Sequence, residues 1–146
     1  MTDLILAILH HVAVFGLVAA LAMEGAMLRA PLIDTARLVR LDAGFGATAM
    51  LVVAVGASRV IWGGKGWGFY EANPYFWAKI GLFAAIGLIS ILPTLAFFRW
   101  RKAAAGNAAF TPPAAEVKQV RLWVGLEALL LVPLLVSAAA MARWPF

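Results

Sequence analysis

The chain has 146 residues, of which 64% are apolar and 13% charged, with a formal net charge of +5 and no cysteine. Because soluble domains contain about half apolar and a quarter charged residues, this composition excludes an ordinary water-soluble protein. The lack of cysteine excludes disulfides, thiolate metal sites and cysteine catalysis. The basic residues gather in two connections between apolar runs, so membrane orientation explains the positive charge better than nucleic-acid binding does.

Four apolar runs are each long enough to cross a bilayer. They cover residues 4–28, 43–62, 75–98 and 120–141. The first run has only Asp3 as a charge before it and continues to Leu28, which favours a retained helix over a cleaved signal peptide. We therefore predict an all-α fold, an integral membrane four-helix bundle that forms a single domain over residues 1–146.

Helix-start signals precede three of the four runs. Asp34 is a capping residue for an interfacial extension of the second run, and Asn73 followed by Pro74 is typical of a helix start for the third. Pro112 and Pro113 have the same role before the fourth run.

Basic residues predict the orientation in the membrane. The second connection and the C-terminal tail contain only Lys65 and Arg143, whereas eight basic residues follow the first and third runs. These are Arg29, Arg37, Arg40, Arg99, Arg101, Lys102, Lys118 and Arg121. By the positive-inside rule, the first and third connections are cytoplasmic and both termini lie on the outer, periplasmic side.

The outward connection, residues 63–76, combines four glycines with aromatic side chains. Aromatic residues gather at the membrane–water interface, and glycines allow a loop to fold back onto helix ends. The segment is therefore either an interfacial anchor or a lid over a pocket on that side.

Ionisable residues inside the apolar runs indicate a functional site, because a charge at mid-membrane costs at least ~2.5 kcal/mol. They are His10, His11, Glu24, Arg59, Lys79 and Glu127. At 1.5 Å per residue, His10, Arg59 and Lys79 lie about 9, 6 and 7 Å from the outer helix ends and so share the outer leaflet. Glu24 and Glu127 share the inner leaflet.

The helical repeat separates the two histidines. His10 lies on the same face as Glu24, fourteen residues later, whereas His11 is turned about 100° away. Each group also has an ordinary explanation: a single histidine can be a hydrogen-bonded core residue, and Arg59 and Lys79 can extend to the interface. The convergence of a histidine, an arginine and a lysine from three helices at one depth favours a shared site instead.

Such a set suits an anionic, planar and redox-active ligand. Neutral imidazole from His10 can bind haem iron, and the unprotonated amine of Lys79 can be a second ligand. Arg59 would then pair with a propionate. A site for a bare metal ion fits less well, because the outer group is mostly cationic.

As a whole chain, the sequence resembles a family of uncharacterised four-helix bacterial inner-membrane proteins. More distantly it is similar to HemJ-type protoporphyrinogen oxidases and to the membrane domain of copper-resistance proteins. The matching residues are Ile8-Leu9-His10, Val12-Ala13-Val14, Trp77-Ala78-Lys79, Arg99-Trp100-Arg101-Lys102, Glu127 and Pro145-Phe146. The resemblance to the oxidases implies that His10 and Lys79 are axial ligands of haem b.

Two classes of function follow. The first is a membrane protein that binds haem b or a porphyrin, with a possible redox role in protoporphyrinogen oxidation. In it, electrons leave through quinone, and Glu24 and Glu127 carry protons. The second is a non-catalytic subunit packed in a larger respiratory or photosynthetic complex, or in a homo-oligomer. A transporter is a weaker third alternative, because the chain is short for two inverted repeats.

Overall fold

The computed structural model describes residues 2–145, so Phe146 of the C-terminal motif lies outside the described residues. Within that range the chain forms helices and no strand. The helices are α1 (Thr2–Met27), α2 (Thr35–Trp62), α3 (Trp67–Glu71), α4 (Pro74–Gly106) and α5 (Ala114–Arg143). The predicted all-α fold is confirmed.

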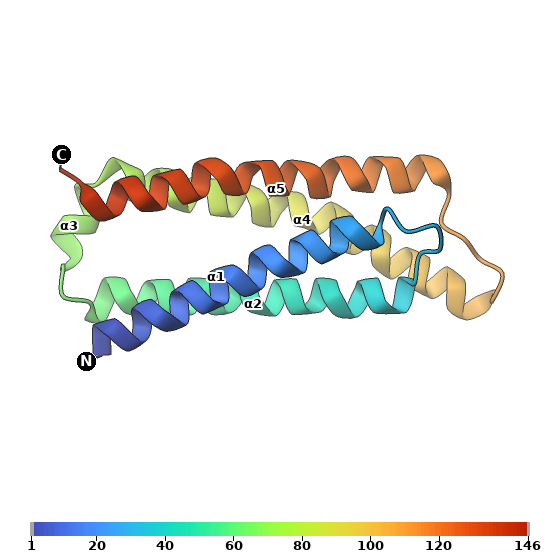
Figure 1. Cartoon of the computed structure of the whole chain (residues 1–146), viewed down its shortest axis with the longest axis horizontal. Coiled ribbons are helices and arrows are strands. Elements are labelled where there is room, and N and C mark those ends of the chain that lie inside the picture. Colours follow the sequence, from blue (N-terminus) through green and yellow to red (C-terminus); the bar gives the residue numbers. More distant parts are fainter. Residues whose placement is uncertain (1, 146) are drawn as a thin grey trace.

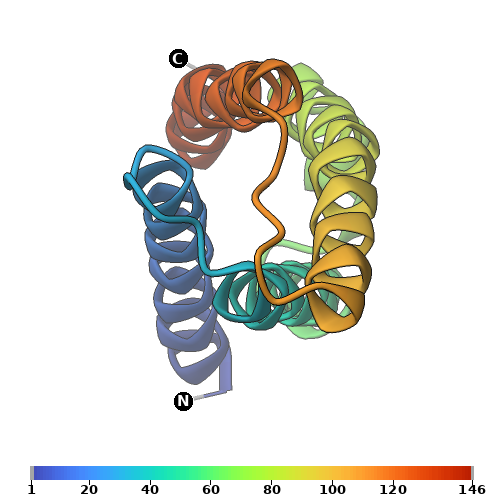
Figure 2. The same ribbon diagram turned by 90° about the vertical axis from the view of Figure 1, so that its right-hand side faces the viewer.

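The four long helices run alternately up and down and form a ring in the order α1, α2, α4, α5 (Figures 1 and 2). Each is long and apolar enough to cross a membrane. Because each packs only against its two neighbours in the ring, α1 lies diagonally opposite α4. Side chains from α1 and α4 can therefore meet only across the interior of the bundle.

The helices extend beyond the apolar runs that predict them. α2 begins at Thr35 and includes the expected interfacial extension without a break. α4 continues through the basic segment 99–102 to Gly106, a length of about 50 Å at 1.5 Å per residue. Helical hydrogen bonding continues past the membrane boundary because these polar residues are also compatible with a helix.

The predicted helix starts are confirmed. The Asp34 side chain accepts a hydrogen bond from the Arg37 backbone N–H at 2.9 Å and so caps α2. Asn73 caps α4 by accepting from the Tyr75 N–H at 3.0 Å, with Pro74 in the first turn. α5 begins directly after Pro113.

The inner end of the bundle is closed by large apolar side chains. Phe97 and Trp100 of α4 are fully buried there, as are Leu28 and Leu38 beside the first connection. The Arg121 guanidinium of α5 donates to the Leu28 carbonyl through Nε at 2.8 Å, which joins α5 to the end of α1. α1 and α5 are therefore held together at the inner end.

The N-terminal half of α1 runs obliquely away from α5 and follows α2 instead (Figure 1). A close approach at Gly16 allows this path, because a Cβ there would lie 3.4 Å from Cγ2 of Thr48 on α2. The bundle is consequently wider at its outer end. Both described chain ends lie at that same end, as an even number of spans requires; the outward orientation remains a prediction from the basic residues.

Asn73 joins the outer ends of α4 and α5, and we predict that this link stabilises the bundle. Its buried side chain caps α4 and also donates from Nδ2 to the Met141 carbonyl at 3.1 Å. Asn73→Ala should lower the free energy of unfolding by about 2 kcal/mol, because both bonds are lost. Asn73→Ser keeps a capping oxygen but loses the bond to Met141 and should have a smaller effect. Thermal unfolding in detergent measures both, and equal stability of Asn73→Ala and the native protein would contradict the prediction.

Candidate functional site

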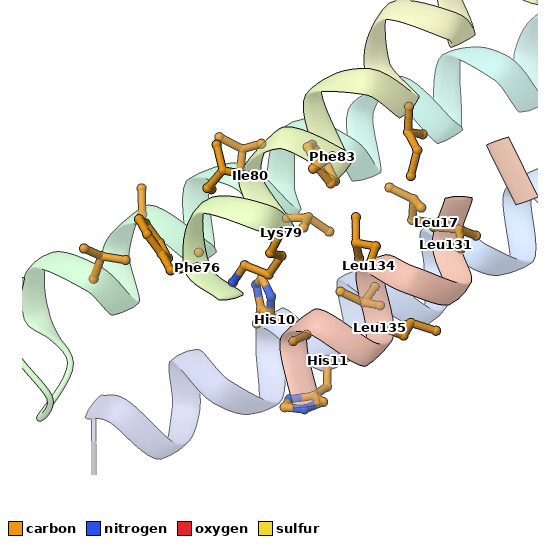
Figure 3. Close-up of a pocket in the computed structure, with 18 of the residues that line it drawn as sticks. His10, His11, Leu17, Phe76, Lys79, Ile80, Phe83, Leu131, Leu134 and Leu135 are labelled. Atoms are coloured by element: carbon orange, nitrogen blue, oxygen red, sulfur yellow. The ribbon is translucent and has the colours of Figure 1, made fainter. Parts of the chain in front are cut away.

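A cavity of about 480 Å³ lies in the outer half of the bundle, within the range typical of small-molecule sites (Figure 3). All four long helices contribute to its wall, which is almost entirely aliphatic and aromatic. Leu17, Ile86 and Leu131 lie at its inner end. Its only ionisable lining residues among those described are His10, His11 and Lys79.

His10 and Lys79 enter the cavity from diagonally opposite helices, α1 and α4. The Lys79 side chain extends toward the His10 ring (Figure 3). His10 Nδ1 is buried and has no hydrogen-bond partner. The ring packs against α2 at Gly56, where a Cβ would lie 3.4 Å from His10 Cε1. Nδ1 therefore lies against α2 and is not exposed to the open space of the cavity.

His11 differs from His10 in its surroundings. Its side chain is exposed, and Nδ1 donates to the Ala7 carbonyl of the preceding turn at 2.6 Å. The two ring centroids are 6.4 Å apart. His11 nevertheless contributes to the cavity rim, which the helical repeat alone does not predict.

The cavity is bordered by side chains on the lateral surface of the bundle. Several of its lining side chains are exposed there, including His11, Ile61, Ile80 and Leu135. In a bundle that spans a membrane, this surface faces lipid. These exposed side chains mark the candidate route by which a ligand dissolved in the bilayer would reach His10 and Lys79.

Arg59 does not line this cavity, although the sequence groups it with His10 and Lys79. Its Nε lies 3.9 Å from Oδ1 of Asp3 on α1, a long ion pair, and the side chain is 30% exposed. Arg59 Nε has no hydrogen-bond partner. The structure thus brings His10 and Lys79 into the cavity. It leaves Arg59, the third predicted residue of this site, beside the N-terminus of α1.

The outward connection folds into an aromatic cluster around Phe76. The Phe76 ring centroid is 5.4 Å from that of Tyr70 and 6.3 Å from that of Trp67. Gly66 adopts a positive φ of 72°, which favours glycine and allows the chain to turn into α3. Residues 63–73 do not line the cavity, but Phe76 does. The cluster therefore fixes one wall of the cavity.

Glu24 and Glu127 lie deeper, in the inner half, and are 2% and 1% exposed. Asp42 on α2 is also buried, 7% exposed, and accepts a hydrogen bond from the Thr94 hydroxyl of α4 at 2.8 Å. Within residues 2–145, no group of three or more His, Asp or Glu side chains could hold a metal ion.

The comparison with protein families gives one match, which covers all four long helices. The family described as "Predicted membrane protein (DUF2214)" matches residues 2–144. The chain belongs to this family. No characterised protein and no solved structure matches it. The family description names no activity, so the similarity to the oxidases remains a prediction.

For this family member, sequence reasoning missed one buried acid. Asp42 directly precedes the second apolar run, residues 43–62, and so does not count among the ionisable residues inside the runs. It nevertheless shares a helix face with Leu38 and Phe45, which are both buried. That spacing of four and three residues is the signal that could have identified it.

Proposed function

We propose that this integral membrane protein binds haem b, or a related porphyrin, in the cavity between His10 and Lys79. One observation carries the proposal: a histidine and a lysine from diagonally opposite helices line one apolar cavity, and the lysine side chain extends toward the histidine ring. Imidazole is the commonest protein ligand of haem iron, and an amine is a suitable second ligand.

The remaining wall fits a flat, largely apolar macrocycle. Aliphatic side chains from α2 and α5 and the rings of Phe76 and Phe83 supply its surface. The lateral opening suits a ligand that partitions into lipid. When bound, haem b would supply one-electron redox chemistry; His10 would hold the iron, and Lys79 would be a second ligand or a partner of a ligand carboxylate.

Arg59 is the candidate partner for a propionate. Its unsatisfied Nε and its long ion pair with Asp3 leave it able to exchange partners. A propionate that extends toward the outer surface would replace Asp3 with a shorter, charge-assisted pair.

A redox role is the enzymatic extension of this proposal. In the oxidation of protoporphyrinogen, each pair of electrons and protons removed from the substrate would reduce one quinone to a quinol. Protoporphyrinogen and quinone both dissolve in the bilayer and would reach the cavity laterally. Binding itself does not depend on this reaction.

Titration of the purified protein with hemin in lipid nanodiscs tests the proposal. We expect a saturable Soret band at one haem per chain. A parallel titration with metal-free protoporphyrin, followed by fluorescence, separates binding of the macrocycle from ligation of iron. No binding of either compound would contradict the proposal and favour a non-catalytic subunit of a larger membrane complex.

We predict that Lys79→Ala retains haem but alters its spectrum. The iron loses one axial ligand and keeps His10, so the Soret band should shift and weaken rather than disappear. Lys65→Ala is the matched control, since this lysine contacts the Ala142 carbonyl and the Phe69 ring outside the cavity. Absorption spectra of both variants with hemin check the prediction. An unchanged Soret band in Lys79→Ala would exclude Lys79 as a ligand.

A further inference from the structure

Buried carboxyl groups from three helices occupy the inner half of the bundle: Glu24 of α1, Asp42 of α2 and Glu127 of α5. The fourth long helix, α4, contributes the Thr94 hydroxyl that donates to Asp42. All four long helices therefore place a polar group in this region. It is distinct from the outer cavity, which none of these residues lines.

The three acids form one electrostatic unit. α1 and α5 come close at this level, since a Cβ at Gly25 would lie 3.9 Å from Cγ1 of Val124. Glu24 directly precedes Gly25 on α1, Glu127 comes three residues after Val124 on α5, and both side chains are buried. The carboxyl groups of Asp42 and Glu127 both act electrostatically on Glu24.

No basic side chain neutralises these acids among residues 2–145, where the ion pairs join Arg59 to Asp3 and Arg99 to Glu116. The arginines nearest in sequence bind backbone carbonyls instead: Arg29 binds Gly25 and Arg121 binds Leu28. Oε1 of Glu24 and Oε1 of Glu127 are buried and have no hydrogen-bond partner.

Such a group of acids is stable in a membrane only if protons neutralise it. An isolated ionised carboxylate in an apolar medium is strongly unfavourable, and neighbouring carboxylates repel each other. A neutral carboxylic acid, by contrast, gains an O–H donor that the ionised form lacks. The proton is thus the ligand that the unpartnered oxygen atoms require.

We propose that Glu24, Asp42 and Glu127 form an occluded proton-binding site, in which the two glutamates hold protons and Asp42 exchanges them. Asp42 is the most exposed of the three, and its side chain already has a hydroxyl partner in Thr94. Leu17, Ile86 and Leu131 separate the site from the outer cavity, and Phe97 and Trp100 close the inner end. The site does not depend on whether the outer cavity binds a porphyrin.

Infrared spectroscopy of the full chain in nanodiscs tests for the protons. We expect a carbonyl band of neutral carboxylic acid at neutral pH, reduced in Glu24→Gln and in Glu127→Gln and weakest in the double variant. Glu116→Gln is the control, because Glu116 accepts from both Arg99 and Trp100 and is ionised. A native protein without this band, or a band of native intensity in the double variant, would overturn the proposal.

Transfer to D2O tests exchange. The band should shift in the native protein, and the shift should be slower in Asp42→Asn, in which the exchanging group is lost. A band that never shifts in the native protein would show a sealed structural acid and overturn the proton-binding role. An unchanged rate in Asp42→Asn would overturn the role of Asp42.

A labelling experiment on the native sequence avoids any dependence on variant folding. Dicyclohexylcarbodiimide is apolar and reacts with protonated carboxyl groups, adding to the acid with retention of all atoms to give an N-acylurea. Peptide mass spectrometry should find the adduct on Glu24 or Glu127 and not on Glu116. Labelling of Glu116 in preference to both buried glutamates would contradict the proposal.

Discussion

Replacing His10 with alanine should abolish the Soret band of the haem-loaded protein. Of the two histidines that line the described cavity, His10 is the one toward which the Lys79 side chain extends. His11→Ala is a closely matched control, because it removes the same side chain one residue later on the same helix. His11 Nδ1 is already bonded to the Ala7 carbonyl, and its ring lies at the exposed rim.

The comparison of these two variants separates ligation from general loss of helix packing. Both proteins should enter the membrane and purify in similar amounts, because alanine favours a helix. Hemin titration of each gives the result directly. If His10→Ala bound haem with an unchanged spectrum, or if His11→Ala lost the band instead, the assignment of His10 would be wrong.

Gly56→Leu should prevent ligand binding by filling the cavity from α2. Even a Cβ at this position would lie 3.4 Å from Cε1 of His10 and 3.8 Å from its Nδ1, so a larger side chain must displace the imidazole. We expect hemin to bind at least about tenfold more weakly, a loss of about 1.4 kcal/mol or more. The change removes no ionisable group from the chain.

Gly44→Leu is the control for this steric test. Gly44 lies on the same helix, but it is exposed and a Cβ there meets no atom within 4 Å. The Gly44→Leu protein should bind hemin like the native protein. Both leucine variants should gain helix propensity. Equal affinity of Gly56→Leu and Gly44→Leu, measured by the same titration, would mean that the ligand binds outside this cavity.

The features that could be predicted from sequence are those that depend on the residues of a single helix. Long apolar runs indicate the four spans, and Asp34 and Asn73 cap the helices that follow them. The helical repeat places His10 and Glu24 on one face, and the structure buries Glu24 and directs His10 to the cavity.

Features that depend on how two helices cross could not be predicted from these patterns. The oblique path of α1 brings Asp3 to Arg59, which therefore pairs with an acid instead of lining the cavity. The position of Asp42 inside the bundle depends on how deeply α2 packs against α4, where Thr94 meets it. Depth along separate helices indicates which groups share a leaflet, whereas tilt and rotation decide which of them meet.

The most direct test of the central claim is the optical spectrum of the protein purified from its membrane, recorded oxidised and then reduced with dithionite. Binding of haem between His10 and Lys79 predicts a Soret band in the oxidised protein, a sharpened visible spectrum on reduction, and the loss of both in His10→Ala. A native protein that shows no Soret band, either as purified or after addition of hemin, would contradict the claim.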